Sequence, residues 1–129
     1  MKEQFIHINE YGTKHYYSDR EMRIHHREDG PAVEFTNGGK TWYINGKCHR
    51  EDGPAVEYTN GYKAWYINDK RHREDGPAVE YVNGCKSWYI NGICLTEKQF
   101  NARMNPVELT LDEIAEKFGV TVDKLKIKK

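Results

Sequence analysis

Apolar residues in the middle of the chain come in short runs separated by polar turns. Segments such as AVEF and WYIN lie between turn signals and have the composition of short strands. The pattern returns every 23 residues, as Trp42, Trp65 and Trp88 show. A period of this length predicts an array in which each unit packs on its neighbours.

Each unit carries two turn signals, and the residues between them have the composition of strands. The first unit has Asn37-Gly38 and Asn45-Gly46, and Asn-Gly favours tight hairpins. The Glu-Asp-Gly-Pro segment indicates a bend, because proline has no N–H for a strand ladder. The expected fold is therefore mainly β, an up-and-down antiparallel meander.

Two-residue loops at both dipeptides would fix the register of the hairpins. Tyr43 would then face Cys48, and Val33 would face Trp42. The side that we predict to be packed contains Val33, Phe35, Trp42, Ile44 and His49. The side that we predict to be exposed contains Ala32, Glu34, Thr41, Tyr43 and Cys48.

The chain divides into three parts on this pattern. Residues 26–94 hold three full repeats, and residues 1–25 match them imperfectly, as expected of a degenerate N-terminal capping repeat. Residues 95–129 lose the repeat and form the expected small helical C-terminal cap, with a helix start at Thr96-Glu97. A second helical face there comprises Leu111, Ile114, Ala115 and Phe118.

The repeated segment WYINGKCHREDGPAVEYTNGYKAWYIN resembles the MORN repeat, a 23-residue β-hairpin unit. It is still more similar to the HREDGPA-type repeats of bacterial and bacteriophage proteins. The resemblance covers residues 26–94. It implies a bacterial or phage accessory protein, with inhibition of a host defence component as the expected role.

The charge balance argues against partners that are attracted by long-range electrostatics. Lysine and arginine number 20, as do aspartate and glutamate, so nucleic acid and anionic membranes are not favoured partners. No segment approaches the length of a membrane span, and the first residues lack a signal-peptide core. Together with three cysteines, an odd number, this predicts a cytoplasmic protein, in the host cell if phage-encoded.

The HRED segments contain residue types used in catalysis, but their spacing does not favour an enzyme. Two strands per unit would separate equivalent residues by about 9.6 Å, too far for the repeated histidines to share a metal ion. We therefore predict no catalytic site, metal or cofactor. We expect Asp29, Asp52 and Asp75 to bond backbone amides of the turn. The guanidinium heads of Arg27, Arg50 and Arg73 are then free to contact a partner.

The tyrosine column formed by Tyr43, Tyr66 and Tyr89 is the other candidate for partner binding. Rigid aromatic side chains on an open sheet are enriched at protein interfaces. A tyrosine ladder also stabilises a sheet by itself, and this second interpretation stays open. The leading hypothesis is a non-enzymatic protein-binding module, with edge strands that could also pair two copies into a homodimer.

Two other functions stay open from the sequence. One is a nucleotide-binding sponge, in which tryptophan or tyrosine stacks on a base while arginine and histidine hold phosphate. The other is DNA binding through the segment TLDEIAEKFGVTVDKL, which resembles the opening of a helix-turn-helix. Only four residues follow Leu125, so a recognition helix would be short.

Overall fold

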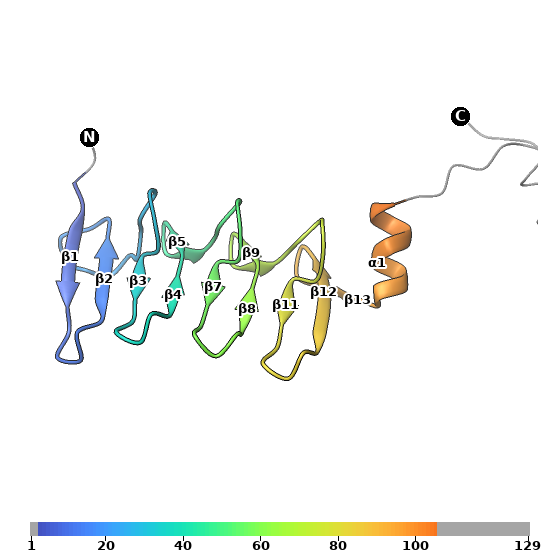
Figure 1. The fold of residues 1–129 in the computed structure, drawn as a ribbon. Helices are drawn as coiled ribbons and strands as arrows, with labels where there is room; N and C mark the ends of the chain where they lie inside the picture. The colour runs from blue at the N-terminus through green and yellow to red at the C-terminus, as the bar shows by residue number, and fades with distance from the viewer. Residues whose placement is uncertain (1–2, 106–129) are drawn as a thin grey trace, which may run out of the picture.

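The computed structural model describes residues 3–105 and shows a row of β-hairpins that ends in one short helix. The strands are antiparallel and follow each other along the array, with the N-terminal hairpin at one end and the helix at the other (Figure 1). The predicted fold class, mainly β with a meander-like sheet and a small C-terminal helix, is confirmed.

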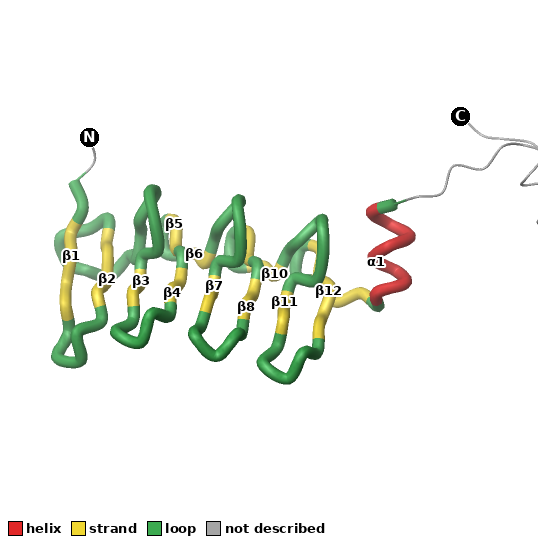
Figure 2. Tube along the Cα trace, in the orientation of Figure 1, coloured by secondary structure: helices red, strands yellow, loops and turns green. Residues whose placement is uncertain are grey.

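The front row of hairpins forms one nine-stranded sheet. Its strands are, in spatial order, β1 (Phe5–Ile8), β2 (Lys14–Tyr17), β3 (Val33–Glu34), β4 (Lys40–Thr41), β7 (Val56–Glu57), β8 (Lys63–Ala64), β11 (Val79–Glu80), β12 (Lys86–Ile90) and β13 (Ile93–Leu95). Most of these strands are very short, and turns and loops make up much of each unit (Figure 2). The units therefore depend on their turns as much as on their ladders.

A second row of small hairpins lies behind the first (Figure 1). It contains β5 (Tyr43–Ile44) with β6 (Lys47–Cys48), and β9 (Tyr66–Ile67) with β10 (Lys70–Arg71). Backbone hydrogen bonds link this row from unit to unit, since Asp69 N–H donates to the Cys48 carbonyl at 2.9 Å and Gly92 N–H donates to the Arg71 carbonyl at 2.8 Å. Each 23-residue unit thus adds one hairpin to each row.

The back-row turn follows the sequence prediction. Asn45 and Gly46 both have positive φ angles, 52° and 79°, as a two-residue turn with two left-handed residues requires. Tyr43 pairs with Cys48, and Ile44 with Lys47. The predicted register of this hairpin is confirmed.

The front-row turn departs from the prediction by one residue. Glu34 pairs with Lys40, and Phe35 N–H donates to the Gly39 carbonyl at 2.9 Å, which leaves a three-residue loop. Gly38 alone takes the left-handed conformation, with φ of 98°, and the Asn37 side chain accepts the Gly39 N–H at 2.9 Å. Such three-residue loops are the next most common hairpin connection.

This shift changes which residues share a side of the sheet. Val33 lies opposite Thr41 and not opposite Trp42, so the predicted packed and exposed sides were wrong. Ala32, Thr41 and Cys48, expected on the exposed side, are buried, whereas Phe35, expected in the packed side, is 38% exposed.

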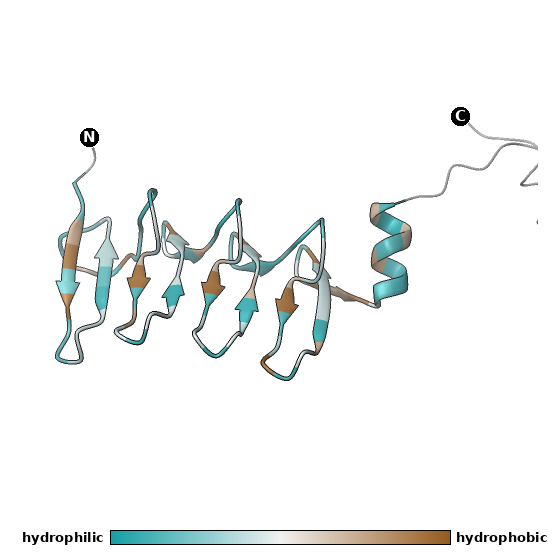
Figure 3. Ribbon diagram, viewed as in Figure 1, coloured by the Kyte–Doolittle hydropathy of each residue, from teal (hydrophilic) through white to brown (hydrophobic). Residues whose placement is uncertain are grey.

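The core is thin and lies on both sides of the front sheet. One side buries Val33, Thr41, Ala64 and Val79, and the other buries Ala32, Ala55 and Ala78. Figure 3 shows the apolar valine positions recurring on β3, β7 and β11, beside hydrophilic positions on β4 and β8. Small buried residues let the two rows and the loops approach closely.

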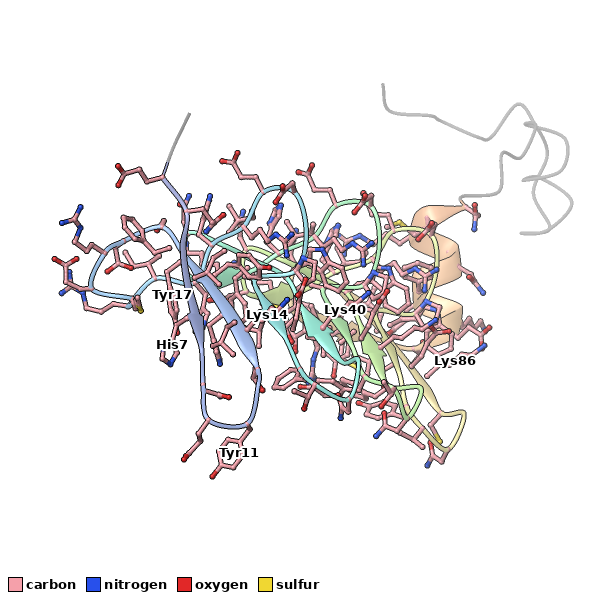
Figure 4. All side chains as sticks on the ribbon, turned by 60° about the vertical axis from the view of Figure 1, so that its left-hand side comes forward. His7, Tyr11, Lys14, Tyr17, Lys40 and Lys86 are labelled. Atoms are coloured by element: carbon pink, nitrogen blue, oxygen red, sulfur yellow. The ribbon has the colours of Figure 1, made fainter. Side chains whose placement is uncertain are left out.

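Opposite charges alternate from strand to strand across the front sheet. The cross-strand neighbours at one level are, in order, Lys14, Glu34, Lys40, Glu57, Lys63, Glu80 and Lys86. Figure 4 shows Lys14, Lys40 and Lys86 along this sheet. Every lysine has a glutamate directly across the ladder, which favours this register over a slipped one.

The helix α1 (Glu97–Met104) covers the C-terminal end of the array. Thr96 accepts the Gln99 N–H and the Gln99 side chain accepts the Thr96 N–H, a complete capping box. Phe100 is 3% exposed and anchors the helix near β12 and β13. The predicted helix start is confirmed, whereas the second predicted helix and the DNA-binding segment lie outside the described residues.

At the opposite end, β1 pairs only with β2 among residues 3–105. Its outer edge is open, and pairing of two copies through it stays a prediction. No helix in the described range is long and apolar enough to cross a membrane.

Candidate functional site

The HRED corners use their arginines to hold the chain together. In the middle unit, Arg50 Nε donates to Asp52 at 3.0 Å, and Nη1 donates to the Pro54 carbonyl at 3.0 Å and to Glu57 at 3.3 Å. The guanidinium also lies 3.8 Å from the ring centre of Trp42, in cation–π contact. Nε, Nη1 and the face over Trp42 are thus all engaged inside the chain.

The other two corners repeat the bonds to the aspartate and to the proline carbonyl. Arg27 also pairs with Glu34 at 2.9 Å, whereas within residues 3–105 Arg73 has no such pair with Glu80. Arg27 lies 4.0 Å from the ring centre of Tyr16, and Arg73 lies 3.9 Å from that of Trp65. Burial opposes the charge of Arg27, but its hydrogen bonds to Asp29 and Glu34 outweigh that effect and raise its pKa. The prediction that Arg27, Arg50 and Arg73 present free guanidinium heads is therefore corrected.

The corner aspartates and histidines also have local roles. Asp29, Asp52 and Asp75 accept hydrogen bonds from arginine Nε at 2.8–3.0 Å, whereas backbone amides had been expected as their donors. The corner histidines accept backbone N–H groups through Nδ1, at 2.9 Å for His26, 3.1 Å for His49 and 3.0 Å for His72. These corners close turns and join neighbouring units.

Open grooves separate one corner from the next. The groove between the second and third corners has a volume of about 780 Å³, and Trp65 and His72 line it between Arg50 and Arg73. The guanidinium of Arg73 already lies over the ring of Trp65. Arg50 and Arg73 each form an ion pair with the aspartate of their own corner. Within residues 3–105, both arginines of this groove are thus already paired, which does not favour a nucleotide phosphate between these two corners.

The predicted tyrosine column lies in the back row of hairpins. Tyr43, Tyr66 and Tyr89 are half-buried, and they are not the fully exposed column that the sequence suggested. Arg71 Nε donates to the Tyr66 hydroxyl at 3.2 Å, and Arg71 Nη1 donates to the Tyr89 hydroxyl at 3.3 Å. One guanidinium thus joins two members of the column.

A more exposed strip of aromatic rings runs along the ends of the front hairpins. Phe35 and Tyr58 are 6.2 Å apart between ring centres, Tyr58 stacks with Tyr62 at 5.6 Å, and Tyr62 meets Tyr81 edge to face at 6.0 Å. Phe35, Tyr58 and Tyr81 are 38%, 44% and 37% exposed. The sequence analysis missed this strip because the register error placed Phe35 inside.

The strip and the tyrosine column lie on one side of the sheet. Val79 pairs with Ser87, Tyr81 of the strip is two residues beyond Val79, and Tyr89 of the column is two residues beyond Ser87 in β12. Burial raises the pKa of Tyr62, and Tyr66 of the column is the next largest contribution. Burial likewise raises the pKa of Tyr43, with a smaller contribution from Tyr58 of the strip. We call this surface the tyrosine face; it comprises Phe35, Tyr43, Tyr58, Tyr62, Tyr66, Tyr81, Tyr89 and Arg71.

Arg71 is the unusual charge of the tyrosine face. The bonds to the Tyr66 and Tyr89 hydroxyls raise its pKa despite burial, so it is charged. Among residues 3–105 no carboxylate lies within ion-pair distance of it, in contrast to the three corner arginines. The signal in the sequence is a departure from the repeat, because Cys48 and Cys94 occupy the equivalent position.

Comparisons with protein-family models, with curated proteins and with solved structures gave no match. The resemblance to MORN-like and HREDGPA-type repeats therefore stays a prediction from the residues.

Proposed function

We propose that this protein is a non-enzymatic protein-binding module that engages its partner through the tyrosine face. The observation that carries the proposal is Arg71, a charged guanidinium without a carboxylate partner in the described range, set among half-exposed tyrosines. A partner carboxylate placed against Arg71 would complete the ion pair that the chain itself does not supply.

The composition of the surface supports this proposal. Tyrosine and arginine are the residue types most enriched at interface hot spots, and stacked rings lose little conformational entropy on binding. The strip follows several units of a repeat array, and extended surfaces of this kind suit a protein partner better than a small molecule.

The resemblance to HREDGPA-type repeats supports a more specific partner. We propose that a phage-encoded copy of this module occupies a bacterial defence protein in the host cytoplasm. Expression of the chain in a strain that carries the defence system should then restore plaque formation. The Arg71→Ala variant should lose this effect, and equal plaque formation with the variant would argue against the tyrosine face.

The direct test is affinity purification from a bacterial lysate with matched variants. Arg71→Ala, and separately Tyr58→Ala with Tyr81→Ala, should each reduce retention of a captured protein by about tenfold or more, as loss of a hot spot does. Arg20→Ala and Tyr11→Ala are the controls, since both residues are exposed, and Tyr11 lies at the tip of the first hairpin (Figure 4).

All variants must first show the circular dichroism spectrum and melting temperature of the parent chain. Equal retention by the folded Arg71→Ala and tyrosine variants would exclude the tyrosine face as the binding surface. Loss of retention in the two control variants would place the surface elsewhere on the array.

A further inference from the structure

The six histidines of the chain fall into two sets with different surroundings. His26, His49 and His72 belong to the corners, where each Nδ1 accepts a backbone N–H. The other three lie in the N-terminal capping unit and are His7, His15 and His25. The tertiary contacts of these three set them apart from the corner set.

His7, His15 and His25 occupy positions whose structural equivalents in the regular repeats are not histidine. His7 pairs with His15 across β1 and β2, as Val33 pairs with Thr41 in the next unit. The His25 carbonyl accepts the Gly46 N–H, as the Cys48 carbonyl accepts the Asp69 N–H. Three positions that are valine, threonine and cysteine in the first full repeat are thus all histidine in the cap.

These positions are neighbours in space, although they come from two strands and a loop. His15 Nδ1 lies 3.1 Å from His25 Nε2, and their ring centres are 5.3 Å apart. The ring centre of His7 lies 6.4 Å from that of His15. Figure 4 shows His7 near Tyr17 at this end of the sheet, and the Tyr17 ring stacks with His15 at 6.1 Å.

The separation of the two nitrogens fits joint binding of one metal ion. Two imidazole nitrogens at about 2.0–2.1 Å from one ion lie roughly 2.9–3.4 Å apart for bond angles between square and tetrahedral. A single hydrogen bond between the rings would give a similar distance, but it would not account for the third histidine. His7 is exposed and projects from the adjacent strand.

The surroundings also favour the form of histidine that binds metals. Burial lowers the pKa of His15, with a further contribution from His7, and burial followed by His15 lowers that of His25. The neutral imidazole is the form that binds metal ions. Within residues 3–105 no three potential ligands already converge on one point, so His7 has to turn toward the other two.

We propose that His7, His15 and His25 bind a late divalent transition-metal ion such as Zn²⁺ or Ni²⁺, with water in the remaining positions. Imidazole ligands suit these ions. The ion would join β1, β2 and the loop before the first corner, at the end of the array opposite α1. The site borders the tyrosine face, since the ring centre of His25 lies 5.3 Å from that of Tyr43.

The test is titration of the full chain, without a histidine tag and after treatment with a chelator, with ZnCl₂ in a calorimeter. We expect one equivalent of Zn²⁺ to bind. His25→Ala should weaken binding by about 100-fold, because His25 supplies one of the two preset nitrogens, and His7→Ala by about tenfold or more. His49→Ala is the control, since its ring is engaged in a corner, and should leave binding unchanged.

A spectroscopic measurement keeps the test independent of how the variants fold. Co²⁺ bound to the parent chain should give d–d absorption without the ultraviolet band of a cobalt–thiolate bond. A thiolate band, or full affinity in either the His7→Ala or the His25→Ala variant, would overturn the three-histidine site. So would the absence of Zn²⁺ binding to the parent chain at 1 mM, roughly the weakest range of specific binding.

Discussion

The middle corner offers the sharpest test of how this array is held together. Replacing Arg50 by alanine removes a cation–π contact with Trp42 at 3.8 Å, a hydrogen bond to the Pro54 carbonyl at 3.0 Å, and ion pairs to Asp52 and Glu57. The side chain is 22% exposed, so these contacts are partly shielded from water. The substitution tests whether the corner is scaffold or binding surface.

The expected loss follows from adding the separate contacts. The cation–π contact contributes about 1 kcal/mol. The hydrogen bond to the carbonyl contributes about 1 kcal/mol. The two ion pairs contribute roughly 0.5 kcal/mol each, because Asp52 is 86% exposed and solvent screens it. We therefore expect the free energy of unfolding to fall by about 3 kcal/mol in Arg50→Ala.

Urea unfolding followed by tryptophan fluorescence measures this change. A double-mutant cycle with Trp42→Leu should show a coupling of about 1 kcal/mol between the two side chains. Arg20→Ala removes an exposed arginine from a loop and should change stability by less than about 0.5 kcal/mol. A loss below about 1 kcal/mol in Arg50→Ala would refute the view that the corners hold the units together.

Three further predictions follow from the core, the cap and the thiols. Val79→Ala should lower the free energy of unfolding by about 2 kcal/mol in urea, because Val79 is fully buried. Phe100→Ala should release α1, lower stability by about 3 kcal/mol and speed trypsin cleavage within the helix; an unchanged cleavage rate would contradict the docking. Burial raises the pKa of Cys48 to about 12, so iodoacetamide at pH 8 should label the exposed Cys85 and Cys94 and spare Cys48 until urea is added. Rapid labelling of all three thiols in the native chain would contradict this.

The sequence predicted the features that depend on local turn chemistry and capping. Asn45-Gly46 gave the back-row register because both residues adopt left-handed angles, and Thr96 gave the helix start because its side chain meets the third helical residue. These features depend on a few neighbouring residues. The turn and the helix start can therefore be predicted without knowing which strands pair with each other.

The same dipeptide forms a different loop at Asn37-Gly38, where the predicted two-residue turn is wrong. Here Gly38 has a left-handed backbone and Asn37 does not, whereas Asn45 and Gly46 are both left-handed. The Asn37 side chain accepts the Gly39 N–H. Asn-Gly alone does not distinguish the two loops. Which loop forms depends on the pairs that it creates across the strands, such as Glu34 with Lys40. These pairs can be listed only once the register is known.

The candidate site was only partly predictable for a related reason. Tyr66 and Tyr89 recur every 23 residues and were predicted on that ground, but Arg71 stands where the other units have cysteine, so recurrence gives no signal for it. The corner arginines recur for a structural purpose. In a repeat array, the positions that repeat can be those that join units, and the exceptions can be those that carry function.

The same backbone hydrogen bond recurs in successive units, and this has a consequence for how such a chain can change in length. Arg50 N–H donates to the Tyr66 carbonyl, and Arg73 N–H donates to the Tyr89 carbonyl, with distances of 3.0 and 3.2 Å. Excision of residues 49–71 would therefore bring together two surfaces that already fit each other. Unequal recombination between the near-identical coding segments could shorten or extend the protein by whole modules while leaving both ends intact.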